Sequence, residues 1–162
     1  MHLEFDEFVR YTNGERDKWR AWFGAHPEAM ATEVQPGGRF VTVGALIDHI
    51  FLVERRHLQR LTGTKLDERT GLSGHHAPPL FDYGASVRRE LEKFVSDLDS
   101  DEADQPTFTV QSGGEFSLTP RKLLFHCLLH ETHHWAQIAL SLRRAGLEPP
   151  GNHDLFYSRA LR

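Results

Sequence analysis

The chain has 162 residues, of which 39% are hydrophobic and 26% are charged, and its formal net charge at neutral pH is −4. This balance is typical of a globular protein, so we expect residues 1–162 to form a single domain. No lysine- and arginine-rich block favours nucleic-acid binding, no apolar run is long enough to span a bilayer, and the first residues lack the order of a signal peptide. The single cysteine, Cys127, cannot form an internal disulfide and fits a reducing compartment, so we expect a cytoplasmic protein.

The first two predicted helices are separated by a segment rich in proline and glycine. Residues 5–24 place apolar side chains at helical spacing among charged neighbours. The second helix is expected to run from Thr42, a suitable N-cap, to about Leu61, with Gly63 just beyond it. Its apolar stripe consists of Leu46, Ile47, Ile50, Phe51, Val53, Leu58 and Leu61.

Two further helices are predicted in the second half of the chain. A polar loop over residues 62–81 precedes a third helix, which Asp82 could cap and which ends near Leu98. The acidic segment that follows is predicted to be a solvated loop, and "TFTV" and "EFSL" around "QSGG" could pair as a small hairpin. Thr119–Pro120, a cap followed by proline, then predicts a fourth helix that ends at Arg144–Ala145.

The predicted elements together favour one fold class. Four amphipathic helices joined by loops are typical of an all-α four-helix bundle, here with long loops and a small hairpin before the last helix. The C-terminal tail is expected to pack against the bundle through Leu155, Phe156 and Tyr157.

The fourth predicted helix carries an unusual concentration of histidine. His126, His130, His133 and His134, four of the chain's 11 histidines, fall within nine consecutive positions. At about 100° per residue they share one helix face with Gln137, and His130 and His134 can turn their nitrogens toward one point. Because a catalytic zinc site has three protein ligands, this pair predicts a metal clamp that needs a third ligand from a facing helix.

His49 is the best candidate for the third ligand, since it borders the apolar stripe of the second helix. His57, two turns further on, is the reserve candidate. The remaining histidines are weaker candidates because of their place in loops or near the ends of elements: His2, His26, His75, His76 and His153. A purely structural role for the cluster is the alternative, although imidazoles packed together without an ion leave donors and acceptors to be satisfied.

The letters "HETHH", residues 130–134, also match the HExxH pattern of zinc hydrolases, in which the glutamate, here Glu131, acts as general base. This match is short, and a histidine-rich helix produces it easily. No histidine follows at the metzincin spacing, and Glu148, a possible further ligand, lies beyond the helix end among prolines. A zinc hydrolase is therefore a minor alternative.

The chain resembles the DinB-like, or YfiT-like, metalloenzymes. The resemblance lies in "HCLLHETHHWAQIALSLRRAGLEPP", with "TVGALIDHI" similar to the family's metal-bearing second helix and "GLEPPGNHDLFY" to its closing segment. It implies a four-helix bundle, often dimeric, with a divalent ion, zinc or nickel, held by His49, His130 and His134. His126 then matches a non-ligating position and Gln137 the glutamine after the last ligand, while Trp135–Ala136 replaces the family's Arg-Gly.

The same resemblance implies a metal-dependent S-transferase or isomerase that acts on small electrophiles with a low-molecular-weight thiol as cosubstrate, and a homodimer. A metal-bound thiol is deprotonated at neutral pH and becomes a nucleophile. Asp48 and Glu54 could orient the ligands or be solvated charges, and Trp19 and Trp22 could line the pocket or belong to the core. The sequence identifies no general base. A metal-binding stress or binding module without catalysis is the main rival, because its sequence would look the same.

Overall fold

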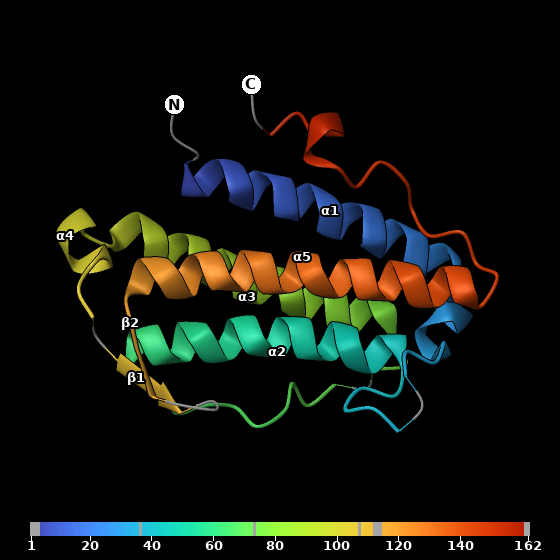
Figure 1. The fold of residues 1–162 in the computed structure, drawn as a ribbon, viewed down its shortest axis with the longest axis horizontal. Helices are drawn as coiled ribbons and strands as arrows, with labels where there is room; N and C mark the ends of the chain where they lie inside the picture. Colours follow the sequence, from blue (N-terminus) through green and yellow to red (C-terminus); the bar gives the residue numbers. More distant parts are fainter. Residues whose placement is uncertain (1–3, 36, 73, 107, 112–114, 161–162) are drawn as a thin grey trace.

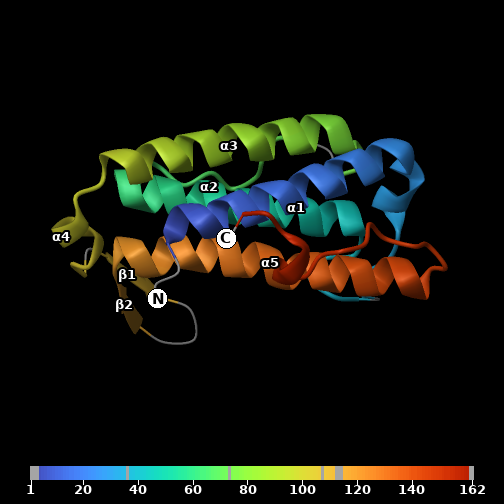
Figure 2. The same cartoon turned by 90° about the horizontal axis from the view of Figure 1, so that it is seen from above.

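The computed structural model describes the chain except for residues 1–3, 36, 73, 107, 112–114 and 161–162. Four long helices lie side by side: α1 (Phe5–Ala25), α2 (Val43–Thr62), α3 (Ala77–Asp97) and α5 (Pro120–Arg144). Figures 1 and 2 show them as a bundle in which α1 and α5 run in one direction and α2 and α3 in the other, with α2 and α5 next to each other over most of their length. The expected all-α four-helix bundle is therefore confirmed.

Short elements connect and flank the long helices. They are the 3-10 helix η1 (Pro27–Ala31), the single-turn helix α4 (Ser100–Ala103), the antiparallel strands β1 (Phe108–Gln111) and β2 (Glu115–Leu118), and the 3-10 helix η2 (Leu155–Tyr157). The two strands form the predicted hairpin, although its turn at residues 112–114 lies outside the described part. No helix in the described ranges combines the length and the apolar character needed to cross a membrane.

The ends of α2 and α5 agree with the capping signals in the sequence. The Thr42 hydroxyl accepts a hydrogen bond from the Ala45 amide at 3.2 Å, and the Thr119 hydroxyl accepts one from the Lys122 amide at 3.1 Å. Gly63 ends α2 in the left-handed conformation, with a φ of 68°. Each hydroxyl satisfies an amide that has no partner within its own helix, which fixes where these two helices begin.

The start of α3 differs from the prediction. The helix begins at Ala77, and Asp82 lies inside it as an exposed residue paired with Arg20. Pro78 and Pro79 fall in the first turn, where the amides need no partner within the helix, so proline does not interrupt it. The acidic segment also contains one helical turn, α4, which Asp99 caps by accepting a hydrogen bond from the Asp101 amide at 2.8 Å.

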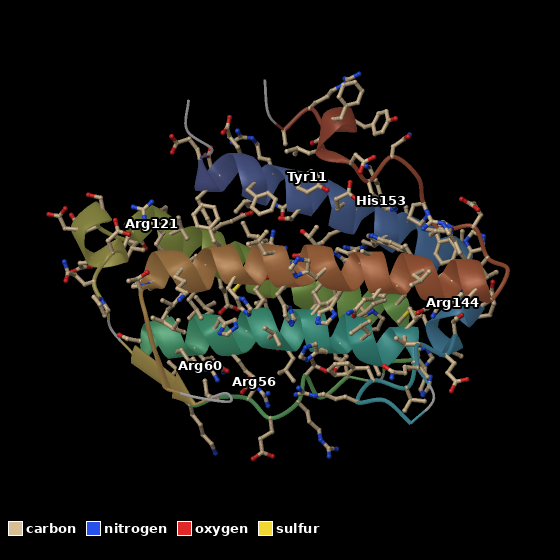
Figure 3. All side chains as sticks on the ribbon, viewed as in Figure 1. Tyr11, Arg56, Arg60, Arg121, Arg144 and His153 are labelled. Atoms are coloured by element: carbon tan, nitrogen blue, oxygen red, sulfur yellow. The ribbon has the colours of Figure 1, made fainter. Side chains whose placement is uncertain are left out.

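The C-terminal tail lies along α1 (Figure 1) but is not held by the residues that the sequence suggested. Phe156 is 90% exposed and Tyr157 57% exposed. Instead, the His153 ring stacks on Trp19 with 5.1 Å between centroids, and the Tyr11 hydroxyl donates to the His153 carbonyl at 2.6 Å (Figure 3). A stacked ring and a main-chain hydrogen bond therefore replace the expected apolar contacts.

A close approach between two backbones positions the loop after α2. A Cβ atom added to Gly44, in the first turn of α2, would lie 1.6 Å from the Gly74 carbonyl oxygen. Only glycine fits at such a distance. The loop over residues 63–76 therefore returns to the start of α2, near the helix position that carries His49.

Candidate metal centre

Three histidines from two helices converge on one point of the α2–α5 seam. The Nε2 atom of His130 lies 3.1 Å from that of His49 and 3.0 Å from that of His134. One ring nitrogen from each residue lies within 4.8 Å of the other two. The structure thus brings together the three residues that the sequence analysis selected, 81 positions apart for His49 and His130.

The spacing of these nitrogens fits a single metal ion. Two nitrogens bound to one zinc ion at about 2.0–2.1 Å in a tetrahedral arrangement are about 3.3 Å apart. The observed separations of 3.0 and 3.1 Å are close to that value. The donor set of three imidazoles suits zinc, nickel, copper or iron, so these residues could hold a divalent ion but do not select one.

Neighbouring side chains orient two of the rings. The Nδ1 atom of His134 lies 2.7 Å from the Gln137 amide oxygen, one turn further along α5, and this contact leaves Nε2 turned toward the other two histidines. The Phe40 ring packs on His49 with 4.3 Å between centroids and meets His134 edge-on. Phe40 precedes α2 and covers one side of the cluster with an apolar surface.

The cluster keeps its histidines neutral. Burial, followed by the charges of His134, Arg39 and Arg56, lowers the pKa of His49 to about 4. Burial and the neighbouring histidines lower the pKa of His130 to about 3, and burial also lowers the pKa of His134. Because a metal binds the neutral imidazole, all three rings are in the ligating form at neutral pH.

The other histidines do not join this group. His57 faces His126 with 5.2 Å between ring centroids, and burial lowers the pKa of His57 to about 3, so the reserve candidate forms a separate pair beside the cluster. His26 stacks on Trp22, His76 occupies the N-cap position of α3 without a capping hydrogen bond from its side chain, and His75 lines a cavity next to His49. His2 lies outside the described residues.

Glu131 cannot serve as the general base of an HExxH site in this arrangement. Its side chain is 1% exposed, and its carboxylate accepts hydrogen bonds from Arg16, Arg88 and the Trp135 indole. All its described partners lie in the bundle core rather than at the histidine cluster. The hydrolase alternative is therefore disfavoured because its base is already committed to buried cations.

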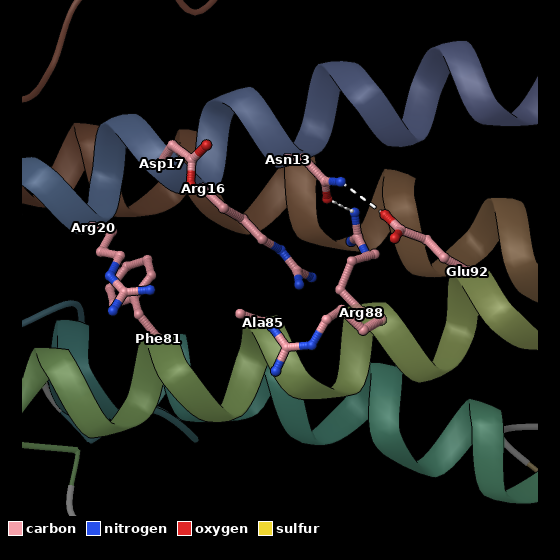
Figure 4. Close-up of a pocket in the computed structure, with 9 residues that line it drawn as sticks. Asn13, Arg16, Asp17, Arg20, Phe81, Ala85, Arg88 and Glu92 are labelled. Carbon is pink, nitrogen blue, oxygen red and sulfur yellow. Dashed lines mark hydrogen bonds between the residues drawn. The ribbon is translucent and has the colours of Figure 1, made fainter.

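Glu54 belongs to the same buried network, and neither sequence interpretation of it was correct. Its carboxylate pairs with Arg16 and accepts hydrogen bonds from Arg88 at 2.8 and 3.0 Å. Burial opposes ionisation, but the two guanidinium groups hold the pKa of Glu54 well below its usual range. Figure 4 shows Arg16 from α1 and Arg88 from α3 reaching into the space between their helices, where Asn13 links Arg88 to Glu92.

The remaining candidates have structural partners. Trp19 is fully buried in the core, and Trp135 stacks on it with 5.1 Å between centroids, so the residue in the position of the family's arginine completes an aromatic cluster. Asp48 accepts a hydrogen bond from the Thr70 hydroxyl. Cys127 is buried, and burial raises the pKa of its thiol, which makes it unsuitable as a nucleophile.

A cavity of about 460 Å³ opens beside the histidine cluster. His49 lines it together with Arg39, Phe40 and Asp48, and the loop over residues 63–76 forms another wall. This volume is in the range of small-molecule sites. The sequence analysis missed the contribution of Arg39 and Phe40, because nothing local shows that the segment before α2 folds back over His49.

The buried charges were also missed, although the sequence carries a signal for them. Glu54 lies four residues from both Ile50 and Leu58, and Arg16 lies three residues before Trp19. A charge at a core position of an apolar stripe predicts a buried partner of opposite sign, because an unpaired buried charge is costly.

Comparison with known proteins agrees with the architecture. A crystal structure of a DinB-like protein from Bacillus cereus ATCC 10987 superposes with a TM-score of 0.63 at 21% sequence identity, over 90% of this chain and 95% of that one. At this identity the match shows the fold alone. No curated protein matches significantly. The sequence model of the DinB family matches residues 1–160, and the chain therefore belongs to the DinB family.

Proposed function

We propose that this protein is a divalent-metal-dependent enzyme of the DinB family. It would either transfer a low-molecular-weight thiol to small electrophiles or isomerise them with the help of that thiol. The observation that carries the proposal is the convergence of His49, His130 and His134 within 4.8 Å beside a cavity. Three neutral protein ligands are typical of catalytic rather than structural zinc sites, because one position of the tetrahedron is left for a small molecule.

The side chains around the cluster support this chemistry. An ion held by the three imidazoles would supply a Lewis-acidic position that favours the deprotonated form of a bound thiol at neutral pH. Gln137 keeps the His134 ring in its ligating orientation, and Phe40 limits the access of water on one side. The only cysteine of the chain, Cys127, is buried, so we infer that the reacting thiol comes from a cosubstrate. The homodimer and the cytoplasmic location stay predictions.

Metal content tests the site directly. Purified wild-type protein should contain about one divalent ion per chain by elemental analysis, whereas His49→Ala should lose it. His133→Ala is the matched control, since His133 is an exposed histidine on the same helix outside the cluster. Equal metal content in wild type and His49→Ala would refute the three-histidine site.

Catalysis requires a separate assay, because a non-catalytic metal-binding module would pass the first test. Metal-loaded and metal-free protein are incubated with a small thiol and a panel of electrophiles. Consumption of the free thiol reports transfer, and conversion of the electrophile without loss of thiol reports isomerisation. We expect conversion of an electrophile that depends on metal and is abolished by His130→Ala. No metal-dependent turnover with any combination would favour the module without catalysis.

A further inference from the structure

The cavity beside His49 contains two arginines that form no ion pair with a carboxylate among the described residues. The Arg39 guanidinium lies over the Phe40 ring, 5.2 Å from its centroid, and has no ion pair among the described residues. Arg56 donates from Nε to the Asp67 carbonyl at 2.6 Å and from Nη2 to the Glu68 carbonyl at 2.9 Å. Both of these acceptors are main-chain oxygens, so Arg56 is held in place without an ion pair to a carboxylate.

The two arginines lie on different walls of the cavity. Arg39 comes from the segment before α2, next to Phe40, which packs on His49. Arg56 lies on α2 two turns after His49, and Figure 3 shows it on the side of α2 that faces the loop over residues 63–76. A molecule in the cavity would therefore meet a guanidinium group from each of two elements while its other end lies near the histidine cluster.

The acidic residues of the cavity do not pair with Arg39 or Arg56, so both guanidinium groups are available to a ligand. Asp48 is engaged by the Thr70 hydroxyl, and Glu68 is an exposed loop residue whose main chain, rather than its carboxylate, contacts Arg56. The formal charges of the two carboxylates and the two guanidinium groups sum to zero, but no ion pair joins them among the described residues. A divalent ion on three neutral imidazoles then adds charge that only a ligand can compensate, which favours an anionic ligand.

We propose that Arg39 and Arg56 recognise a carboxylate group of the small molecule that reacts at the histidine cluster. The planar guanidinium group matches a carboxylate in shape and donates two parallel hydrogen bonds to it. Leu52, Leu72 and Phe40 supply apolar lining, so the ligand is a small carboxylate with a short hydrocarbon portion. This inference rests on the proposed function, because that function makes the histidine cluster the reacting end of the cavity.

Matched ligand pairs test the proposal. On cobalt-substituted protein, binding of 3-mercaptopropionate is compared with that of its uncharged amide, 3-mercaptopropionamide, by calorimetry and by the thiolate-to-cobalt absorption band. Succinate and succinamide form a second pair without a thiol, measured with and without metal. The first pair tests a carboxylate on the thiol cosubstrate. The second pair tests a carboxylate on the electrophilic substrate, for which succinate is a stand-in.

The arginine variants give the decisive readout. In wild type the carboxylate member of at least one pair should bind about tenfold more tightly than its amide, and Arg39→Gln should remove most of that difference. Arg56→Gln should reduce it, whereas Arg56→Lys, which keeps the charge, should retain most of it. The control is Arg144→Gln, which changes an exposed arginine at the C-terminal end of α5 that does not line the cavity, and it should change nothing.

The outcomes separate this proposal from the function on which it rests. Equal binding of carboxylate and amide in both pairs, or a preference that survives both Arg39→Gln and Arg56→Gln, overturns the proposal. A carboxylate that binds only to the ion would show such an arginine-independent preference. If neither thiol produces the charge-transfer band, the thiol-dependent function fails, and the succinate pair still tests the arginines.

Discussion

Replacing Glu131 by glutamine tests whether this residue serves stability or catalysis. The substitution keeps the shape of the side chain but removes the charge that faces Arg16 and Arg88. Both arginines are buried, and the carboxylate accepts hydrogen bonds of 2.7 Å from each of them. Glutamine offers one acceptor oxygen and turns an NH₂ group toward cations, so the core retains a positive charge without full compensation.

The expected cost follows from the burial of the network. Removing one partner of a buried ion pair typically destabilises a protein by about 3–5 kcal/mol. For a chain of this size, 1 kcal/mol lowers the melting temperature by about 2–4 °C. Glu131→Gln should therefore melt about 6–20 °C below wild type, while metal content measured below the transition stays unchanged.

The assay combines thermal and urea unfolding, followed by circular dichroism, with elemental analysis of the folded protein. Glu148→Gln is the matched control, because Glu148 is exposed and an isolated surface change should alter stability by less than about 0.5 kcal/mol. Unchanged stability of Glu131→Gln together with a loss of metal-dependent activity would refute this reasoning and return Glu131 to the role of a base.

Three further predictions concern the pH dependence of stability, the hydrogen bond between Gln137 and His134, and the close approach of Gly44 to the loop after α2. In metal-free protein, the lowered pKa values of His57 and His130, both about 3, mean that the unfolded chain takes up protons first, so the urea midpoint should fall as pH drops from about 6.5 toward 4 and be flat above 7. Gln137→Ala frees the His134 ring and should weaken metal binding about 10- to 100-fold in a competition with a chromogenic chelator, whereas an unchanged affinity would show that the contact is incidental. Gly44→Ala places a methyl group against a loop carbonyl and should destabilise the fold by about 1–3 kcal/mol or more, which urea unfolding measures; a wild-type midpoint would contradict the close approach.

Local signals predicted most of the helix boundaries. Thr42, Gly63 and Thr119 act through hydrogen bonds or a backbone conformation within a few residues, so their meaning does not depend on the rest of the fold. The start of α3 was missed because Pro78 and Pro79 are as compatible with a loop as with a first helical turn. Their role is decided by the burial of Leu80 and Phe81 in the core, which is a tertiary effect.

The candidate ligands could be predicted because histidine spacing on α5 reports directly on one helix face. His49 was selected from its position beside an apolar stripe and from the family resemblance. The direction of Glu131 could not be predicted in the same way. Adjacent residues on a helix differ by about 100°, so His130 faces the cluster while Glu131 points into the core. Only the positions of the neighbouring helices determine which of these two faces borders the candidate metal site.

The four buried charges described above come from four different helices: Arg16 from α1, Glu54 from α2, Arg88 from α3 and Glu131 from α5. A slip of any one helix by a single turn would move its charged side chain about 5.4 Å along the bundle axis and leave the other three without one of their buried partners. The network therefore acts as an axial lock for the whole bundle. Since His49 and His130 lie within two turns of Glu54 and Glu131 on the same helices, this lock also fixes how the two halves of the histidine cluster meet.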